Sequence, residues 1–376
     1  MLRSTKLFRI FGIDVQLHYS WWLVFAFLAW SLSTTFFPHY FPDQNTVTYW
    51  VMGVVAVLLL FVSVLLHELS HSLVAKAKNI NVESITLFFF GGVASIDDED
   101  LKPGSEFLMS IAGPLFSLLL FGLFYVIYLF NGNLFWTAIT FYLYQLNLIL
   151  ALFNLVPGYP LDGGRAFRAI LHAYYKDIKK ATQIAVWGGK SFALLLMLLG
   201  FASMVSNSGN GLWFVFLGAF LYFIAGKSYE QVLVKEALGK ILLRRVLEKN
   251  YVSLDPSLCF SDFLKRYRNS EQEFFVVKDK GMVGILDLRK ISSIPEKTKK
   301  QFTVKQAAVS SELVGLGKND TAYTAFRKFS EQEVDILPVM DKGKLLGLVS
   351  KRKVMHQLLW SLKFGFVEEK KDRMKK

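Results

Sequence analysis

The sequence predicts a polytopic α-helical membrane protein, with about six transmembrane helices followed by a small α+β domain. Three observations predict this class. Of the 376 residues, 53% are hydrophobic and only 19% are charged, whereas a soluble domain carries about a quarter charged residues. The apolar residues gather in runs close to the roughly 20 residues that a helix needs to cross a bilayer. After about residue 230 these runs shorten to strand length and charged residues become frequent.

Six apolar runs are candidate membrane spans. The first is not a cleavable signal peptide, because it begins late and no small-residue cleavage pattern follows it. The fifth contains Lys190 near its start, and the sixth is short for a bilayer. The predicted spans cover residues 18–37, 49–75, 107–130, 134–156, 183–205 and 211–226.

The links between the spans predict the orientation of the chain. Lys and Arg occur before the first span and on the links after the second and fourth spans, whereas the links at 38–48, 131–133 and 206–210 carry none. The positive-inside rule then places both termini of this multi-pass cell-membrane protein in the cytoplasm. This topology explains much of the net charge of +13, so we expect no nucleic-acid partner. The single cysteine, Cys259, excludes a disulfide framework and a cysteine-based metal cluster.

The region after the spans contains a weak internal repeat. Stretches 276–287 and 338–350 each consist of an apolar strand, a Lys-Gly turn, a second strand and a helix start, and an amphipathic helical stretch precedes each of them. This pattern predicts two tandem α+β modules. The predicted organisation is a membrane domain at 1–229 and a soluble domain at 230–376, with repeats at about 244–293 and 304–358 and a basic tail.

The second span contains a pattern typical of metal-dependent hydrolases, His67-Glu68-Leu69-Ser70-His71. Residues four positions apart share one face of a helix, so His67 and His71 can offer two imidazole nitrogens to one metal ion. Glu68 lies beside them and can take a proton from a metal-activated water. Ionisable groups at membrane depth cost about 2–3 kcal/mol or more each, which favours a functional role. The alternative is that the helix has already emerged into the cytoplasmic interface, where such residues are tolerated.

A third metal ligand is expected after the fourth span. A catalytic zinc ion needs three protein ligands and one open position. Asp162 lies in a segment that Pro157, Pro160 and three glycines keep from being a regular helix. Irregular backbone near a membrane is tolerated where it lines a cavity, so the segment is suited to turn a carboxylate toward a metal. The alternative is an ordinary turn with Asp162 as the N-cap of the next helix; beside the two histidines, we favour the ligand.

Two asparagines lie seven residues apart on one face of the fourth span, Asn147 and Asn154. A buried amide in a membrane needs a hydrogen-bond partner. Asn147 either joins helices or contacts substrate. Asn154 adjoins the irregular segment, where a hydrogen bond to substrate or to a developing oxyanion is favoured.

Together these motifs resemble the site-2 protease family of intramembrane zinc metalloproteases, peptidase family M50. The matching elements lie within residues 1–225 and are HELSH, FNLVPGYPLDGGR at 153–165 and Ala-Gly-Pro at 112–114. The resemblance implies an endopeptidase that hydrolyses peptide bonds of transmembrane protein substrates within the lipid bilayer, as in regulated intramembrane proteolysis. It also implies one zinc ion per chain, with the following residue roles: His67, His71 and Asp162 as zinc ligands, Glu68 as general base and Asn154 in substrate binding.

The repeat after residue 230 resembles a pair of cystathionine-β-synthase (CBS) modules, which some site-2 protease relatives carry on the cytoplasmic side. Such a pair would regulate the protease. Many of these modules bind an adenine nucleotide through an acidic residue shortly after the second strand, but the corresponding residues here are Lys290 and Lys353. A structural or partner-binding role, including a homodimer through the CBS domain, therefore stands beside nucleotide binding.

Residues 80–96 are rich in β-forming residues and contain two adjacent glycines. One hypothesis is a membrane-associated strand or hairpin whose edge pairs with an unwound substrate; the other is a hairpin that only covers the site. The acidic cluster at 97–100 is expected to form a solvated cytoplasmic turn, and the basic tail to contact anionic lipid. The alternative function is a CBS-gated channel or transporter, which would leave HELSH and the 153–165 segment unexplained.

Overall fold

The chain folds into two compact units, Met1–Glu230 and Gln231–Lys376. The boundary falls inside one helix, α8 (Gly211–Gly239). The acidic cluster at 97–100, Lys290 and the basic C-terminal tail lie outside the described residues. The computed structural model describes residues 4–89, 91–96, 101–206, 211–270, 272–279, 282–288, 303–310 and 315–364.

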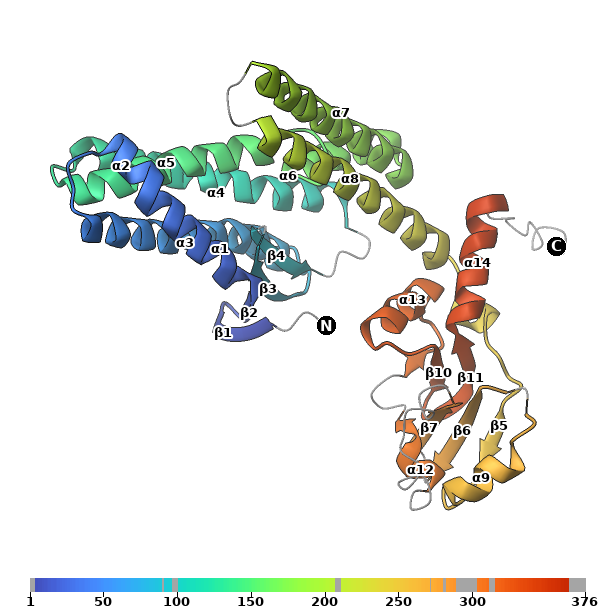
Figure 1. Ribbon diagram of the computed structural model, residues 1–376. Helices are drawn as coiled ribbons and strands as arrows, with labels where there is room; N and C mark the ends of the chain where they lie inside the picture. Colours follow the sequence, from blue (N-terminus) through green and yellow to red (C-terminus); the bar gives the residue numbers. More distant parts are fainter. Residues whose placement is uncertain are drawn as a thin grey trace. The chain divides into compact units, whose positions relative to one another are not determined.

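Six helices in the described part of the chain are long and apolar enough to cross a membrane, which confirms the predicted fold class (Figure 1). The first is interrupted by a π-helical turn at Leu32–Phe36. Another helix, α6 (Asp162–Tyr175), is amphipathic and lies between the fourth and fifth spans. The spans are α1–α2 (Ser20–Tyr40), α3 (Thr46–Ala77), α4 (Pro103–Phe130), α5 (Leu134–Asn154), α7 (Ile178–Val205) and α8 (Gly211–Gly239).

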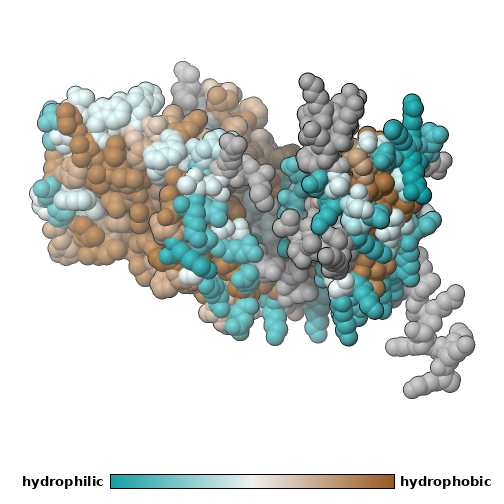
Figure 2. Space-filling view, turned by 90° about the horizontal axis from the view of Figure 1, so that it is seen from below, coloured by the Kyte–Doolittle hydropathy of each residue, from teal (hydrophilic) through white to brown (hydrophobic). Residues whose placement is uncertain are grey.

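The longest helix, α3, organises the first unit. Its N-terminus is capped by Asn45, whose side chain accepts a hydrogen bond from the Thr48 backbone N–H at 2.7 Å. The N-terminal half of α3 packs against α1, α2 and α5 around fully buried side chains such as Met52 and Leu143. Outward-facing side chains of the spans are largely hydrophobic, as the brown surface of Figure 2 shows. In lipid this surface is not exposed to water.

A four-stranded sheet packs against α3 in the first unit. The strand order is β1-β2-β3-β4; β2 and β3 pair in parallel and the other neighbours are antiparallel. The hairpin predicted at 80–96 is confirmed as β3–β4, with β4 at a sheet edge, whereas the N-terminal hairpin was not predicted. The strands are β1 (Ser4–Ile10), β2 (Ile13–His18), β3 (Val82–Phe88) and β4 (Gly91–Ile96).

The second unit contains two α+β repeats, but their boundary differs from the predicted one. Residues 304–310, expected to open the second repeat, belong to the first, because β8 pairs with β7. In each, a helix precedes an antiparallel strand pair, and an additional short strand lies parallel to the first strand of that pair. The first repeat contains β5 (Val252–Leu254), α9 (Phe260–Arg266), β6 (Phe274–Asp279), β7 (Met282–Asp287), α12 (Val304–Ala307) and β8 (Val309–Ser310). The second contains β9 (Leu316–Gly317), α13 (Ala322–Glu331), β10 (Ile336–Asp341), β11 (Lys344–Ser350) and α14 (Lys351–Phe364).

The end of α8 belongs to the core of the second repeat. Leu238, which is fully buried, packs in one cluster with Phe329 of α13 and Val354 of α14. The apolar run that we assigned to the sixth span ends at 226, but the helix continues to Gly239. The last of these extra turns is stabilised because Ala237 and Leu238 are buried by protein rather than by lipid.

Candidate active site

The two histidines of HELSH lie together on the buried face of α3. His67 Nε2 and His71 Nε2 are 3.3 Å apart, and the two residues are 4% and 7% exposed. The separation follows from the helix, since positions four apart lie one above the other. Both ring nitrogens therefore reach the same point in the interior.

Helix α4 fixes the orientation of both imidazole rings. The Met109 carbonyl accepts a hydrogen bond from His71 Nδ1 at 2.6 Å, so neutral His71 has a free lone pair on Nε2. His67 Nδ1 lies 2.8 Å from Ser117 Oγ. Such partners of the far ring nitrogen are typical of metal-ligating histidines. The rings fit because α4 presents Gly113 to them: a Cβ there would collide with His71 Nε2 and lie 2.6 Å from His67 Nε2.

Asp162 reaches the same point from a distant part of the chain. Its Oδ2 lies 3.1 Å from Nε2 of both His67 and His71. It is the first residue of α6, whose N-cap is Leu161, so it does not cap the helix as in the alternative considered above. Burial raises the pKa of the Asp162 carboxyl, but the two neighbouring imidazole groups outweigh burial and hold this pKa below its ordinary value. The carboxyl group is thus ionised, as a metal ligand must be.

The three side chains form a donor set suited to zinc. One ligand atom from each lies within 4.8 Å of the others. Two imidazole nitrogens and one carboxylate oxygen, with a fourth position left for water, are a donor set typical of catalytic zinc. The histidine partners on α4 add the outer contacts that such sites need. The residues present therefore fit the metal that the sequence predicted.

A cavity of about 390 Å³ opens beside this cluster. Glu68 and Asn154 line it, together with Arg165 of α6 and residues 91–94 of the edge strand β4. A volume of this size holds water and a short piece of extended peptide. Asn147 does not line the cavity; it is fully buried and its amide donates to the Leu143 carbonyl and to Ser63 Oγ, which joins α5 to α3.

Sequence reasoning missed several residues around the cluster. Met109 contributes only its carbonyl group, which no side-chain pattern reveals. Ser117 was not singled out, although a hydroxyl in an apolar run is a signal that it needs a partner. Arg165 ends the 153–165 motif but was assigned no role at the site. A buried ion pair between Glu106 and Arg168 was also missed.

Comparison with known proteins gives consistent matches. A model of peptidase family M50 matches residues 55–142 and 132–198, and a CBS-domain model matches residues 304–359. The chain is 32% identical over 357 residues to a zinc metalloprotease of Methanocaldococcus jannaschii. The aligned region covers 94% of this chain and 96% of that protein. It is also 32% identical over 148 residues to stage IV sporulation protein FB of Bacillus subtilis, covering 38% of this chain and 48% of that protein. A solved structure of a site-2 protease from Methanocaldococcus jannaschii is 34% identical, with 60% of this chain and 94% of that chain covered and a TM-score of 0.41.

Apolar spanning helices that bury the two histidines of an HExxH motif beside a carboxylate as third ligand define a membrane-embedded metallopeptidase. The chain belongs to peptidase family M50, the site-2 proteases, and carries a CBS region after its membrane unit. It is a multi-pass intramembrane zinc metalloprotease, as the motifs predicted, and its metal cofactor is zinc. Membership of this peptidase family decides for the protease over the alternative of a CBS-gated channel or transporter.

Proposed function

We propose that His67, His71 and Asp162 bind the zinc ion of this protease. In this proposal Glu68 is the general base and Asn154 contacts the substrate. The observation that carries it is the position of Asp162 Oδ2, 3.1 Å from both imidazole Nε2 atoms. Asp162 and His67 are 95 residues apart in the chain, so local backbone geometry does not bring them together.

The chemistry follows from the groups that surround the cavity. When bound, zinc lowers the pKa of a coordinated water toward about 7 and polarises a carbonyl group. Glu68 takes the proton that the attacking water gives up and passes it to the leaving amine nitrogen. The Asn154 amide donates a hydrogen bond to the scissile carbonyl oxygen while negative charge develops on it. Ser117 and the Met109 carbonyl keep the two imidazole rings from rotating during these steps.

The proposed substrate is a segment of a membrane protein, made extended before it is cut. A helical segment hides its carbonyl groups in hydrogen bonds, so it has to unwind to be attacked. Strand β4 lies at the edge of its sheet, and its residues 91–94 line the cavity. An edge strand offers unpaired backbone N–H and C=O groups, which supports pairing with the unwound segment next to Glu68.

The role of Glu68 is tested by Glu68→Gln, with zinc content and cleavage of a co-expressed membrane substrate measured on the same preparations. We expect wild-type zinc content, because Glu68 is not a ligand, and a cleavage rate lower by about 10²–10⁴-fold, because the proton acceptor is gone. Glu83→Gln, the same chemical change at an exposed position of β3, should cleave normally. Wild-type cleavage by Glu68→Gln would refute the assignment of the base.

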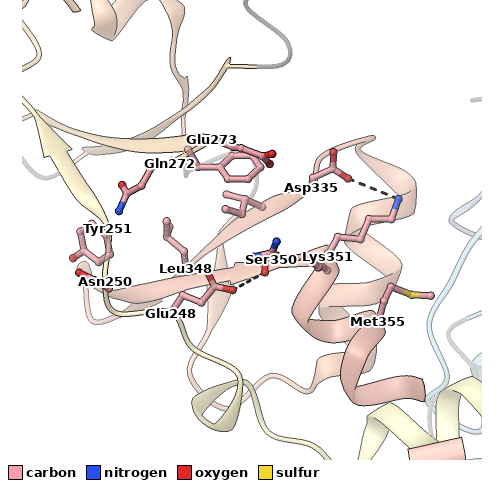
Figure 3. A pocket seen from close by; sticks show the side chains of 13 residues that line it. Glu248, Asn250, Tyr251, Gln272, Glu273, Asp335, Leu348, Ser350, Lys351 and Met355 are labelled. Carbon is pink, nitrogen blue, oxygen red and sulfur yellow. Dashed lines mark hydrogen bonds and ion pairs between the residues drawn. The ribbon is translucent and has the colours of Figure 1, made fainter. Parts of the chain in front are cut away.

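We propose further that the second unit binds an adenine nucleotide in a cleft of about 630 Å³ (Figure 3). Both repeats line this cleft: Tyr251 and Phe274 offer aromatic faces for a base, while Lys351 and Arg352 offer charges for phosphates. Lys353, at the position expected to be acidic, donates instead to the Leu247 carbonyl at 3.2 Å. In this proposal, other acidic residues that line the cleft accept hydrogen bonds from the ribose hydroxyl groups.

Titration of the full-length protein with ATP, followed by thermal unfolding, tests nucleotide binding. We expect the unfolding midpoint of the second unit to rise with ATP concentration. Arg352→Ala should weaken the effect, whereas Lys265→Ala, at an exposed position of α9 that does not line the cleft, should not. An unchanged midpoint up to millimolar ATP would contradict the proposal and leave the cleft a structural feature.

We propose cytoplasmic termini and a homodimer through the second unit. The alternating charges of the links support the orientation. For the dimer, the support is the exposed apolar face of α14, where Leu359 and Trp360 are each 53% exposed. In a Cys259→Ser background, Leu359→Cys should form a disulfide-linked dimer in membranes, and Lys265→Cys should not. A monomer in both cases would contradict the dimer.

A further inference from the structure

A buried ion pair joins α4 to α6 beside the proposed metal site. Glu106 is 1% exposed and Arg168 is 7% exposed. Arg168 Nε donates to Glu106 Oε1 at 2.7 Å, and Arg168 Nη2 donates to the same oxygen. Burying two charges carries a desolvation cost that often cancels their attraction, so apolar residues of similar size would hold two helices together as well. Packing alone is therefore a weak explanation for this pair.

Each of the two helices that the pair joins holds a different part of the proposed metal site: α4 orients the imidazole rings and α6 carries the carboxylate. Helix α4 holds the imidazole rings through the Met109 carbonyl and Ser117, which follow Glu106 along the helix. Helix α6 begins with Asp162, less than two turns before Arg168. A helix is stiff over this length. Fixing Arg168 to α4 therefore fixes the Asp162 carboxylate relative to the two rings.

Arg168 also contacts the segment that leads into Asp162. Its guanidinium carbon lies 5.0 Å from the centre of the Tyr159 ring, within the range of a cation–π interaction. Tyr159 precedes Asp162 by three residues. The guanidinium group thus belongs to a residue that follows Asp162, contacts a residue that precedes it, and is bound to Glu106 of α4.

We propose that Glu106 and Arg168 are positioning residues that hold Asp162 at the place where it binds zinc, and so set the affinity of the site for the metal. The proposal rests on the ligand set proposed above. Metal sites tolerate ligand displacements of only about 0.5 Å, and loss of an outer contact typically lowers metal affinity 10–100-fold. We expect a loss of that size when the pair is removed.

The experiment removes both charges together, so that neither is left buried alone. The double variant Glu106→Gln/Arg168→Met keeps the approximate volume of both side chains. We expect an unfolding midpoint close to that of wild type, a zinc dissociation constant 10–100-fold higher by chelator competition, and altered visible absorption bands after loading with Co²⁺. Ile139→Val, in a fully buried position of α5, is the control: it should lower the unfolding midpoint and leave zinc affinity unchanged.

Asp162→Ala separates the two proposals. If Asp162→Ala binds zinc as tightly as wild type, the ligand assignment itself is wrong. If Asp162→Ala loses zinc while the folded double variant binds it with wild-type affinity, the positioning role is wrong and the pair is a packing contact. Should the double variant not fold, Arg168→Lys keeps the charge but loses the paired donors and the stacking on Tyr159. It should then show weakened zinc binding at a near-wild-type unfolding midpoint, and unchanged zinc affinity would again overturn the proposal.

Discussion

At Gly113, α4 passes so close to the two imidazole rings that no side chain fits between them. In Gly113→Ala the new Cβ would have to displace His71 Nε2 and crowd His67 Nε2. We expect zinc content after purification to fall at least tenfold, because the rings can no longer converge with Asp162. Metal analysis checks this. Gly122→Ala on the same helix meets no atom within 4 Å and should keep its zinc; equal zinc in both variants would contradict the account.

At this scale the sequence was most informative where the chemistry is local. His67, Glu68 and His71 belong to one helical turn, so the distance between the two imidazoles follows from helix geometry alone. Asp162 could be proposed as the third ligand because an irregular segment follows an apolar span. Its distance from the histidines, however, depends on how α3, α4 and α6 pack. The Met109 carbonyl could not be predicted as a partner of His71, because every residue has a backbone carbonyl and the sequence does not distinguish one from another.

Among the elements, α7 supports the irregular segment before Asp162. The Tyr159 backbone N–H donates to the Ala185 carbonyl at 3.1 Å, and Gly189 lies directly against the Tyr159 backbone. A Cβ on Gly189 would collide with the Tyr159 carbonyl oxygen. In Gly189→Ala we therefore expect the segment to shift, with lower stability and several-fold weaker zinc binding.

Gly200→Ala is the matched control for that prediction. It also introduces a steric clash on α7, with its Cβ 2.7 Å from the Gly211 carbonyl oxygen, but at the contact with α8 instead of the Asp162 segment. It should lower the unfolding midpoint and leave zinc affinity unchanged. If both variants bind zinc equally well, α7 does not position the segment.

The elements themselves were predictable to different degrees. Spans were found because a bilayer demands long apolar runs, and the hairpin at 80–96 because β-forming residues flank two glycines. The hairpin β1–β2 was not predicted, although Ile13, Val15 and Leu17 of its second strand alternate with polar residues. Its first strand is largely exposed and carries Lys6 and Arg9, so no such alternation marks that strand. Its Lys6 pairs with Asp14 across the two strands at 2.7 Å, a contact that only the register reveals.

For the molecule as a whole, the end of α8 supplies core residues to the second repeat, and the stability of that repeat depends on them. Leu238→Ala should cost about 2–5 kcal/mol in the free energy of unfolding of the second unit, since a fully buried side chain leaves a cavity. Chemical denaturation of a fragment covering residues 231–364 measures this. Lys240→Ala, two residues away and 62% exposed, should change it by no more than about 0.5 kcal/mol. Equal effects would mean that α8 does not belong to this core.

The proposed zinc ligands come from two distant parts of the chain, which affects the order in which the site forms during synthesis. His71 and Asp162 are 91 residues apart, and two further spans lie between them. While the ribosome is still extending the chain, an inserted α3 has its histidines but no carboxylate to complete the site. On the proposed ligand set, the metal site is therefore complete only after the fourth span has been inserted and α6 has docked, so proteolytic activity follows membrane assembly.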